Sequence, residues 1–154
     1  AHGNPDAIDF PRPMIYDISP AGEYDFSFSG LKTSVLYYLR DNPPSSAKAS
    51  AGKKSKIADV AASFQKAAID VLVEKTGRAA KKFKVKSIML SGGVAANKML
   101  RKELSVVSYK LCVNFLAAPA KFNTDNAAMI AVAGYFAYLR KKKYKLIAQG
   151  NLNI

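Results

Sequence analysis

The sequence predicts an α/β fold, and the second half of the chain carries the observations that lead to it. An apolar stretch, Val85 to Leu90, precedes a helix-like pattern from Asn97 to Ser108, and a second apolar stretch, Leu111 to Ala117, follows. Apolar runs separated by an amphipathic helix are typical of parallel strands joined by a right-handed crossover. We therefore expect a mostly parallel sheet with flanking helices.

The first half of the chain predicts a lead-in, a strand and a long helix. Residues 1–23 are rich in Gly and Pro and predict an extended lead-in. Aromatic and polar residues alternate over residues 24–28, as in a half-buried strand, and Ser29 is a suitable N-cap for the helix that follows. The composition of residues 42–55 predicts a mobile loop within the domain, and residues 56–82 predict a helix.

The predicted long helix has an apolar face, and Gly77 is a possible end of its regular part. Its predicted buried residues are Ile57, Val60, Ala61, Phe64, Ala68, Val71 and Leu72. The last helix is expected over residues 124–142 with Thr124 as its N-cap, and its aromatic residues Tyr135, Phe136 and Tyr138 are expected in the core.

Bulk composition is that of one globular domain of 154 residues. The sequence has no apolar run long enough to cross a bilayer and no secretory leader pattern, which indicates a cytoplasmic protein without membrane partners. Its single cysteine, Cys112, excludes an intrachain disulfide and is expected to be a buried strand thiol.

Charge is distributed unevenly between the two halves. The formal net charge is +13, and residues 1–77 contribute nothing to it because nine Lys and Arg balance nine Asp and Glu. Residues 78–154 carry fifteen Lys and Arg against Glu103 and Asp125 alone. Such a basic half suits a polyanion such as RNA, although a solubilising surface would have the same composition.

A glycine turn, Ser91 to Asn97, lies between the first predicted strand and the next helix. Adjacent glycines let the backbone approach a ligand closely, and a helix N-terminus favours phosphate. The alternative is a strand-to-helix connection that needs glycine for its dihedral angles. Asn97 has the same two interpretations, because its amide could contact a nucleotide or cap the helix.

Asp125 is one of two acids in the basic half and stands near the start of the last predicted helix. It could bind a metal ion or cap the helix, and position alone favours the cap. His2 is the only histidine, so this sequence cannot build a histidine-rich metal site or a convincing Ser-His-Asp triad.

Four ordered blocks nevertheless resemble one family. They are Gly3-Asn4-Pro5 with Phe10-Pro11-Arg12-Pro13-Met14, then Asp25 to Thr33, then Ser91 to Asn97 with Leu100-Arg101, then Thr124 to Ala131. Together they resemble the TsaD family, the tRNA N6-adenosine threonylcarbamoyltransferases formerly described as O-sialoglycoprotein endopeptidases.

The resemblance implies a partial ASKHA fold, the actin-like and hexokinase-like architecture with a mixed sheet and flanking helices. It implies transfer of a threonylcarbamoyl group from threonylcarbamoyl-AMP to N6 of adenosine 37 of tRNA. Gly92, Gly93 and Asn97 would bind the adenylate. Asp125 would be a ligand of the catalytic metal, iron or zinc, so the resemblance reverses the preference for a cap.

The same resemblance implies that two metal-binding histidines lie in a preceding N-terminal half. Asn123 stands where the family commonly has cysteine. We therefore expect the C-terminal portion of the enzyme, inactive by itself, whose partners are tRNA, that N-terminal half and the accessory subunits of the modifying complex. A non-catalytic ASKHA partner or RNA-binding module is the alternative. A metalloprotease ranks last, because no His-Glu-x-x-His motif is present.

Overall fold

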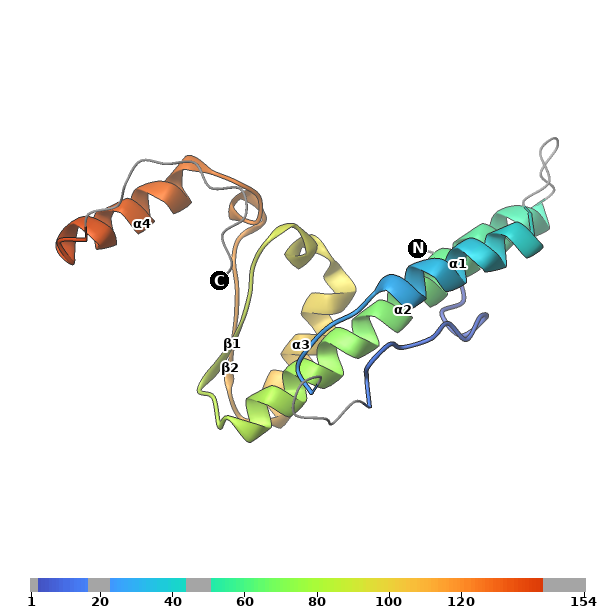
Figure 1. Cartoon of the computed structure of the whole chain (residues 1–154), viewed down its shortest axis with the longest axis horizontal. Helices are drawn as coiled ribbons and strands as arrows, with labels where there is room; N and C mark the ends of the chain where they lie inside the picture. Colours follow the sequence, from blue (N-terminus) through green and yellow to red (C-terminus); the bar gives the residue numbers. More distant parts are fainter. Residues whose placement is uncertain (1–2, 17–22, 44–50, 143–154) are drawn as a thin grey trace.

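The computed structural model describes residues 3–16, 23–43 and 51–142 and is a mixed α/β structure (Figure 1). The elements are α1 (Ser29–Asp41), α2 (Ala51–Lys82), β1 (Ser87–Leu90), the 3-10 turn η1 (Gly93–Ala96), α3 (Lys98–Lys110), β2 (Asn114–Ala117), the 3-10 turn η2 (Ala120–Phe122) and α4 (Ala127–Leu139). No described helix combines the length and apolar character that a membrane crossing requires.

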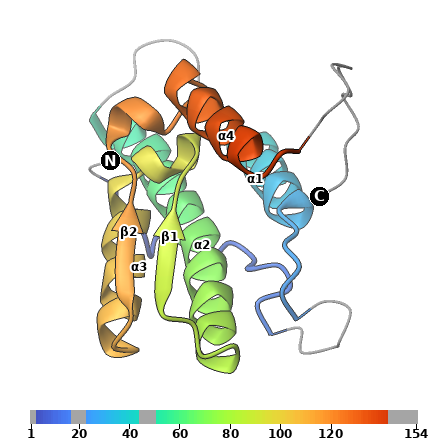
Figure 2. The ribbon, with the colours of Figure 1, turned by 90° about the vertical axis from the view of Figure 1, so that its left-hand side faces the viewer.

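The two strands form a parallel pair, as the sequence predicts. Ser87 lies opposite Asn114 and Leu90 opposite Ala117, and α3 connects the strands. Figure 2 shows α2 and α3 behind both strands, so the two helices cover the same face of the sheet. The carboxyl ends of β1 and β2 therefore lie at one end of the sheet, and the carboxyl ends of α2 and α3 lie at the other (Figure 2).

Helix α2 contributes residues to both hydrophobic clusters and so connects the two parts of the described structure. The first cluster contains Phe10, Leu31, Val60 and Ala67, and the second contains Ile69, Leu100 and Leu104. The first joins the lead-in and α1 to α2, and the second joins α3 and the sheet to α2. Polar contacts add to the first, because Arg12 Nε donates to Asp70 Oδ2 at 2.8 Å, which raises the pKa of Arg12.

The two faces of the sheet differ in burial. Ile88 points toward the helices and is 6% exposed, whereas Met89 and Leu116 on the opposite face are 76% and 49% exposed. Successive strand residues alternate between faces, so neighbouring apolar side chains have opposite environments. Parallel sheets are usually covered on both faces. Within the described residues, only one face of this sheet is covered by helices (Figure 2).

Helix α4 extends away from the α1–α2–α3 body (Figure 1). None of its residues is buried, and Tyr135, Phe136 and Tyr138 are 59%, 52% and 80% exposed. Their predicted place in the core is therefore wrong for the described part of the chain. The helix begins at Ala127 and is capped by Asn126, so the predicted Thr124 cap is wrong as well.

Three expectations for the first half need correction. The predicted strand over residues 24–28 does not form, because no other described strand lies beside these residues to pair with their backbone. Ser29 is the first residue of α1, and Phe28 occupies the cap position without a side-chain hydrogen bond. The predicted 42–55 loop is too long, since α2 begins at Ala51 and already includes residues 51–55; residues 44–50 lie outside the described residues.

The predicted buried face of α2 is only partly correct. Val60 and Val71 are buried, but Ile57 and Phe64 are 53% and 42% exposed. The helix also continues past Gly77 to Lys82. A Cβ on Gly77 would lie 3.2 Å from Val107 Cγ1, so glycine allows α3 to approach α2 closely.

Cys112 is exposed and lies in the turn between α3 and β2, with a φ of 54°. The predicted buried strand thiol is therefore wrong. Helix α3 runs to Lys110 and β2 starts only at Asn114, which leaves the cysteine in the connection.

Candidate nucleotide site at the glycine turn

The glycine turn follows the carboxyl end of β1. Gly92 has a φ of 84° and a ψ of 174°, a backbone conformation that L side chains rarely adopt, so glycine is required there. Gly93 has no positive φ, and a Cβ added to either glycine would meet no atom within 4 Å. The turn is therefore open to its surroundings. Neither the backbone conformation nor a neighbouring atom requires glycine at position 93.

Asn97 ends the turn and caps α3, which confirms the structural interpretation of this residue. Its Oδ1 accepts hydrogen bonds from the backbone N–H groups of Met99 and Leu100, each at 3.0 Å. Its Nδ2 donates to Gln65 Oε1 at 3.1 Å. An amide nitrogen has two hydrogens, so one remains for a further acceptor. The adenylate contact of Asn97 stays a prediction.

Arg101 joins the two strand ends. Its Nε donates to the carbonyl of Ala95 in η1, and its Nη2 donates to the carbonyl of Ala118 after β2 at 2.8 Å. Arg101 therefore holds the glycine turn beside the loop that leads to α4. The sequence alone indicates neither the contacts of Arg101 nor that of Gln65, because each joins elements that are far apart in the chain.

Asp125 lies in the loop between η2 and α4 and is exposed. The preference from position alone, that it caps the helix, is wrong. Asn126 is the cap, with Oδ1 accepting from Met129 N at 2.9 Å and Nδ2 donating to the Thr124 carbonyl at 2.9 Å. The interpretation of Asp125 as a metal ligand stays a prediction.

Asp125 does not make a metal centre with the other described residues. No three His, Cys, Asp or Glu side chains in the described ranges gather closely enough to hold a metal ion. His2 lies outside the described residues. One carboxylate is too few donors for iron or zinc, so the described donor set does not fit a complete metal site.

Asn123 lies two residues before Asp125 and is 4% exposed. Neither its Nδ2 nor its Oδ1 has a hydrogen-bond partner among the described residues. A buried amide without partners costs free energy, so Asn123 lowers the stability of the segment between η2 and α4.

Two cavities flank the glycine turn. One of about 280 Å³ opens on the uncovered face of the sheet and is lined by Met89, Leu90, Ser91, Leu116, Ala117 and Ala118. The other, about 330 Å³, reaches from α2 to Val94 and Asn97. In open α/β sheets ligands bind beyond the carboxyl ends of the strands, and the glycine turn has this position.

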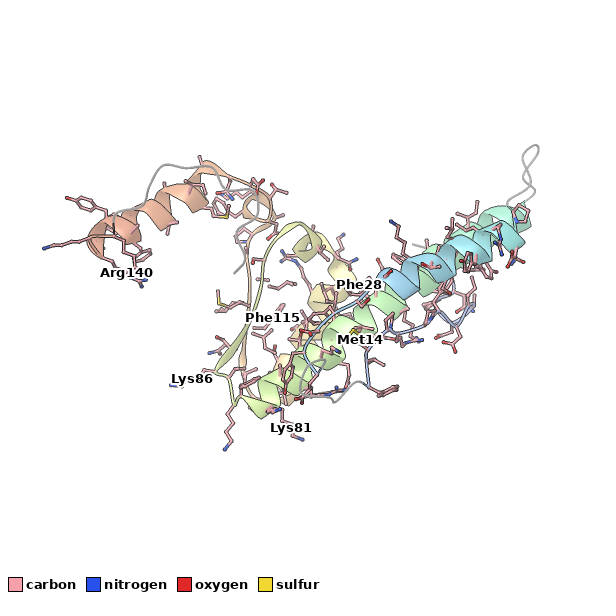
Figure 3. The ribbon with its side chains drawn as sticks, in the orientation of Figure 1. Met14, Phe28, Lys81, Lys86, Phe115 and Arg140 are labelled. Atoms are coloured by element: carbon pink, nitrogen blue, oxygen red, sulfur yellow. The ribbon has the colours of Figure 1, made fainter. Side chains whose placement is uncertain are left out.

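The described cationic residues fall into several groups rather than one surface. Lys98 and Lys102 are exposed on α3 near the glycine turn, whereas Lys81, Lys84 and Lys86 lie at the opposite end of the sheet. Lys81 and Lys86 both project from that opposite end in Figure 3. Lys143 and Lys145 lie outside the described residues.

Comparison with known proteins identifies the family. Residues 1–132 match the family described as TsaD, tRNA N6-adenosine threonylcarbamoyltransferase. The chain is 44% identical to the enzyme of that name from Thermosipho melanesiensis over 99% of its own length and 43% of the relative's. It is 46% identical to the enzyme of that name from Thermosipho africanus over 89% and 38% of the two lengths.

A further relative of the same name, from Desulfitobacterium hafniense, is 47% identical over 90% of this chain and 38% of its own length. The chain thus spans about two fifths of the length of these relatives. The match covers the glycine turn, its cap and Asp125. The chain belongs to the tRNA N6-adenosine threonylcarbamoyltransferase family.

Proposed function

We propose that this chain is the C-terminal portion of a cytoplasmic enzyme that transfers a threonylcarbamoyl group from threonylcarbamoyl-AMP to N6 of adenosine 37 of tRNA. The supporting observation is that the family match includes an open glycine turn at the carboxyl end of a parallel strand. In the reaction the adenine N6 nitrogen attacks the threonylcarbamoyl carbonyl, the bond to the phosphate oxygen breaks, N6 loses a proton and AMP leaves.

The chain's own contribution is one wall of the adenylate site. The open backbone at Gly92 and Gly93 leaves room for the nucleotide, and the remaining Nδ2 hydrogen of Asn97 is available to an acceptor on it. Arg101 and Gln65 act as positioning residues, because they hold η1 and Asn97 in place through the contacts described above.

The rest of the proposed ASKHA fold comes from the part of the relatives that this chain does not span. Its packing surface is the uncovered apolar face of the described residues: Met89 and Leu116 on the sheet, α4, and an apolar groove of about 800 Å³ between α1, α2 and Val94. Helices that are apolar on all sides are normally buried, which supports a covering partner for α4. We propose that accessory subunits of the modifying complex join the completed enzyme.

Asp125 is proposed as one metal ligand of the completed enzyme. The other ligands have to come from outside the described residues, because these supply no three-donor cluster. A bound iron or zinc ion would polarise the carbonyl of the transferred group.

The test joins this chain to the N-terminal portion of the Thermosipho melanesiensis relative and measures threonylcarbamoylation of a tRNA transcript. We expect activity from the chimera and none from the chain alone, since one wall of a site binds the adenylate weakly. The variant Gly93→Leu in the chimera should abolish activity, because its side chain would occupy the space proposed for the nucleotide. A Cβ at this position meets no atom within 4 Å, so the turn itself should tolerate the substitution.

The matched control is Ser105→Leu, which adds the same side chain at an exposed position of α3 outside the glycine turn and outside the proposed packing surface. It should keep the activity of the chimera. Activity of the isolated chain would overturn the proposal. Full activity of the Gly93→Leu chimera together with unchanged binding of the adenylate would overturn it as well.

A further inference from the structure

The end of the sheet opposite the glycine turn carries a compact basic surface, here called the lysine pole. It consists of Lys81, Lys84, Lys86 and Lys110 together with the aromatic residues Phe83 and Tyr109. Helices α2 and α3 end there and strands β1 and β2 begin there. The N–H of Asn114 donates to the carbonyl of Lys86 at 3.1 Å, which places the two helix-to-strand connections side by side (Figure 2).

The four lysines of the pole are exposed, and none forms an ion pair with a described carboxylate. The acid on the neighbouring segment, Glu23, accepts a hydrogen bond from Lys82 Nζ at 2.6 Å. This contact lowers the pKa of Glu23 and raises that of Lys82, so the two charges satisfy each other. The field of the pole is therefore positive.

Helix stabilisation does not account for the whole pole. Lysines in the last turn of a helix interact favourably with its dipole, which is sufficient for Lys81 and Lys110. Lys84 and Lys86 follow the end of α2, and Lys84 has a φ of 48°, where non-glycine residues are uncommon. A local structural role would favour Gly or Asn at this position rather than lysine.

Two exposed aromatic rings lie among these cations. Tyr109 precedes Lys110 and is 85% exposed; Phe83 precedes Lys84 and is 64% exposed. The ring of Phe83 packs against the ring of Tyr24, with 5.5 Å between the ring centroids. Exposed rings beside lysines combine base stacking with phosphate attraction, the two components of contact with unpaired nucleic acid.

We propose that the lysine pole binds RNA, with phosphates on its lysines and an unstacked base on Tyr109. This inference rests on the proposed function, because that function identifies the bound RNA as tRNA. Gly92 lies six positions after Lys86, so a strand rise of ~3.3 Å per residue places the pole roughly 20 Å from the glycine turn. The pole therefore contacts tRNA at a distance from the adenosine to be modified.

The test measures binding of an unmodified tRNA transcript to the chain across a series of salt concentrations. The double variant Lys84→Asn and Lys86→Gln removes two charges from the pole, and asparagine tolerates the positive φ at residue 84. The control Lys32→Gln and Lys102→Gln removes two charges from exposed lysines elsewhere. We expect the pole variant to lower the salt slope by about 1.5 to 2 and the control to change it much less.

Tyr109 has its own pair of variants. Loss of stacking in Tyr109→Ser should weaken tRNA binding about fivefold or more, and Tyr109→Phe should restore it because the ring is kept. The thermal transition of each variant checks that the fold is intact.

Equal loss of salt slope in the pole and control variants would overturn the proposal, because total charge would then account for binding. Unchanged tRNA binding with loss of polyglutamate binding would also overturn it and indicate an acidic protein partner. Transfer by the chimera is measured separately. Its failure would refute the proposed function and leave RNA binding by the pole standing.

Discussion

Helices α3 and α4 are built in the same way but pack differently. Each has thirteen residues and follows a strand of the parallel pair, a short 3-10 turn and an asparagine cap. Asn97 accepts two backbone N–H groups at the start of α3, and Asn126 accepts one at the start of α4. Both helices therefore begin after an asparagine, one of the residue types preferred at the N-cap, whose side chain accepts the first free backbone N–H groups.

The difference lies in the side chains that the two helices present. Helix α3 buries Leu100 and Leu104 against α2 and the sheet, and its other face carries charged and polar residues. Helix α4 is apolar on nearly all sides and buries nothing within the described residues. A cap sets where a helix begins, but burial needs a second surface of matching shape.

The largest expected effect is a core deletion in α3. Leu104→Ala removes a side chain that is 4% exposed, so the free energy of unfolding should fall by about 3 kcal/mol. Chemical denaturation followed by circular dichroism measures the change. The paired variant is Ile130→Ala on α4, which is 66% exposed and should change stability by less than about 0.5 kcal/mol. A large loss from Ile130→Ala would show that α4 is packed after all.

The losses of unfolding free energy should differ less between the two cap variants than between the two apolar variants, Leu104→Ala and Ile130→Ala. Asn97→Ala removes two cap hydrogen bonds and the contact with Gln65, and should lower the free energy of unfolding by about 1–2 kcal/mol. Asn126→Ala should leave global unfolding nearly unchanged, because α4 contributes little to the core, and should reduce only the helical signal. Equal global losses in the two variants would contradict the comparison.

The smallest expected effect is a pH dependence of the packed region. The pKa of Glu23 is lowered by its hydrogen bond with Lys82. The pair therefore stabilises the fold above the ordinary carboxyl pKa of about 4.3, and its contribution is lost as the pH falls below that value toward the folded pKa. Amide exchange of residues 23–28 should accelerate at low pH relative to α2. Lys82→Gln should weaken this dependence, while α4 should show no matching change.

Local signals in the sequence were sufficient for much of the fold. Two short apolar runs separated by an amphipathic stretch predicted β1, α3 and β2, because strand and helix periods depend only on neighbouring residues. The Asn97 cap was among the two interpretations of that residue for the same reason. The prediction of a strand at residues 24–28 was wrong, because alternation alone does not provide a partner strand.

The candidate site was predicted only in part. The need for glycine dihedral angles was one of the two interpretations of the turn, and it holds at Gly92 but not at Gly93. The anchoring of the turn by Arg101 and Gln65 depends on contacts between distant elements. The Asp125 cap was wrong because Asp125 and Asn126 are adjacent polar residues of types that can both serve as caps. The residue type does not show that α4 begins at Ala127, which puts Asn126 at the cap position.

The sequence by itself determined the α/β order, the glycine at the turn, the basic second half and the family resemblance, all of which depend on residue types and short spacings. The tertiary structure decided which apolar faces are covered, how Arg101 links the two strand ends, and where the lysines gather. Burial and charge clustering arise from packing between segments far apart in the chain, so local periodicity cannot specify them.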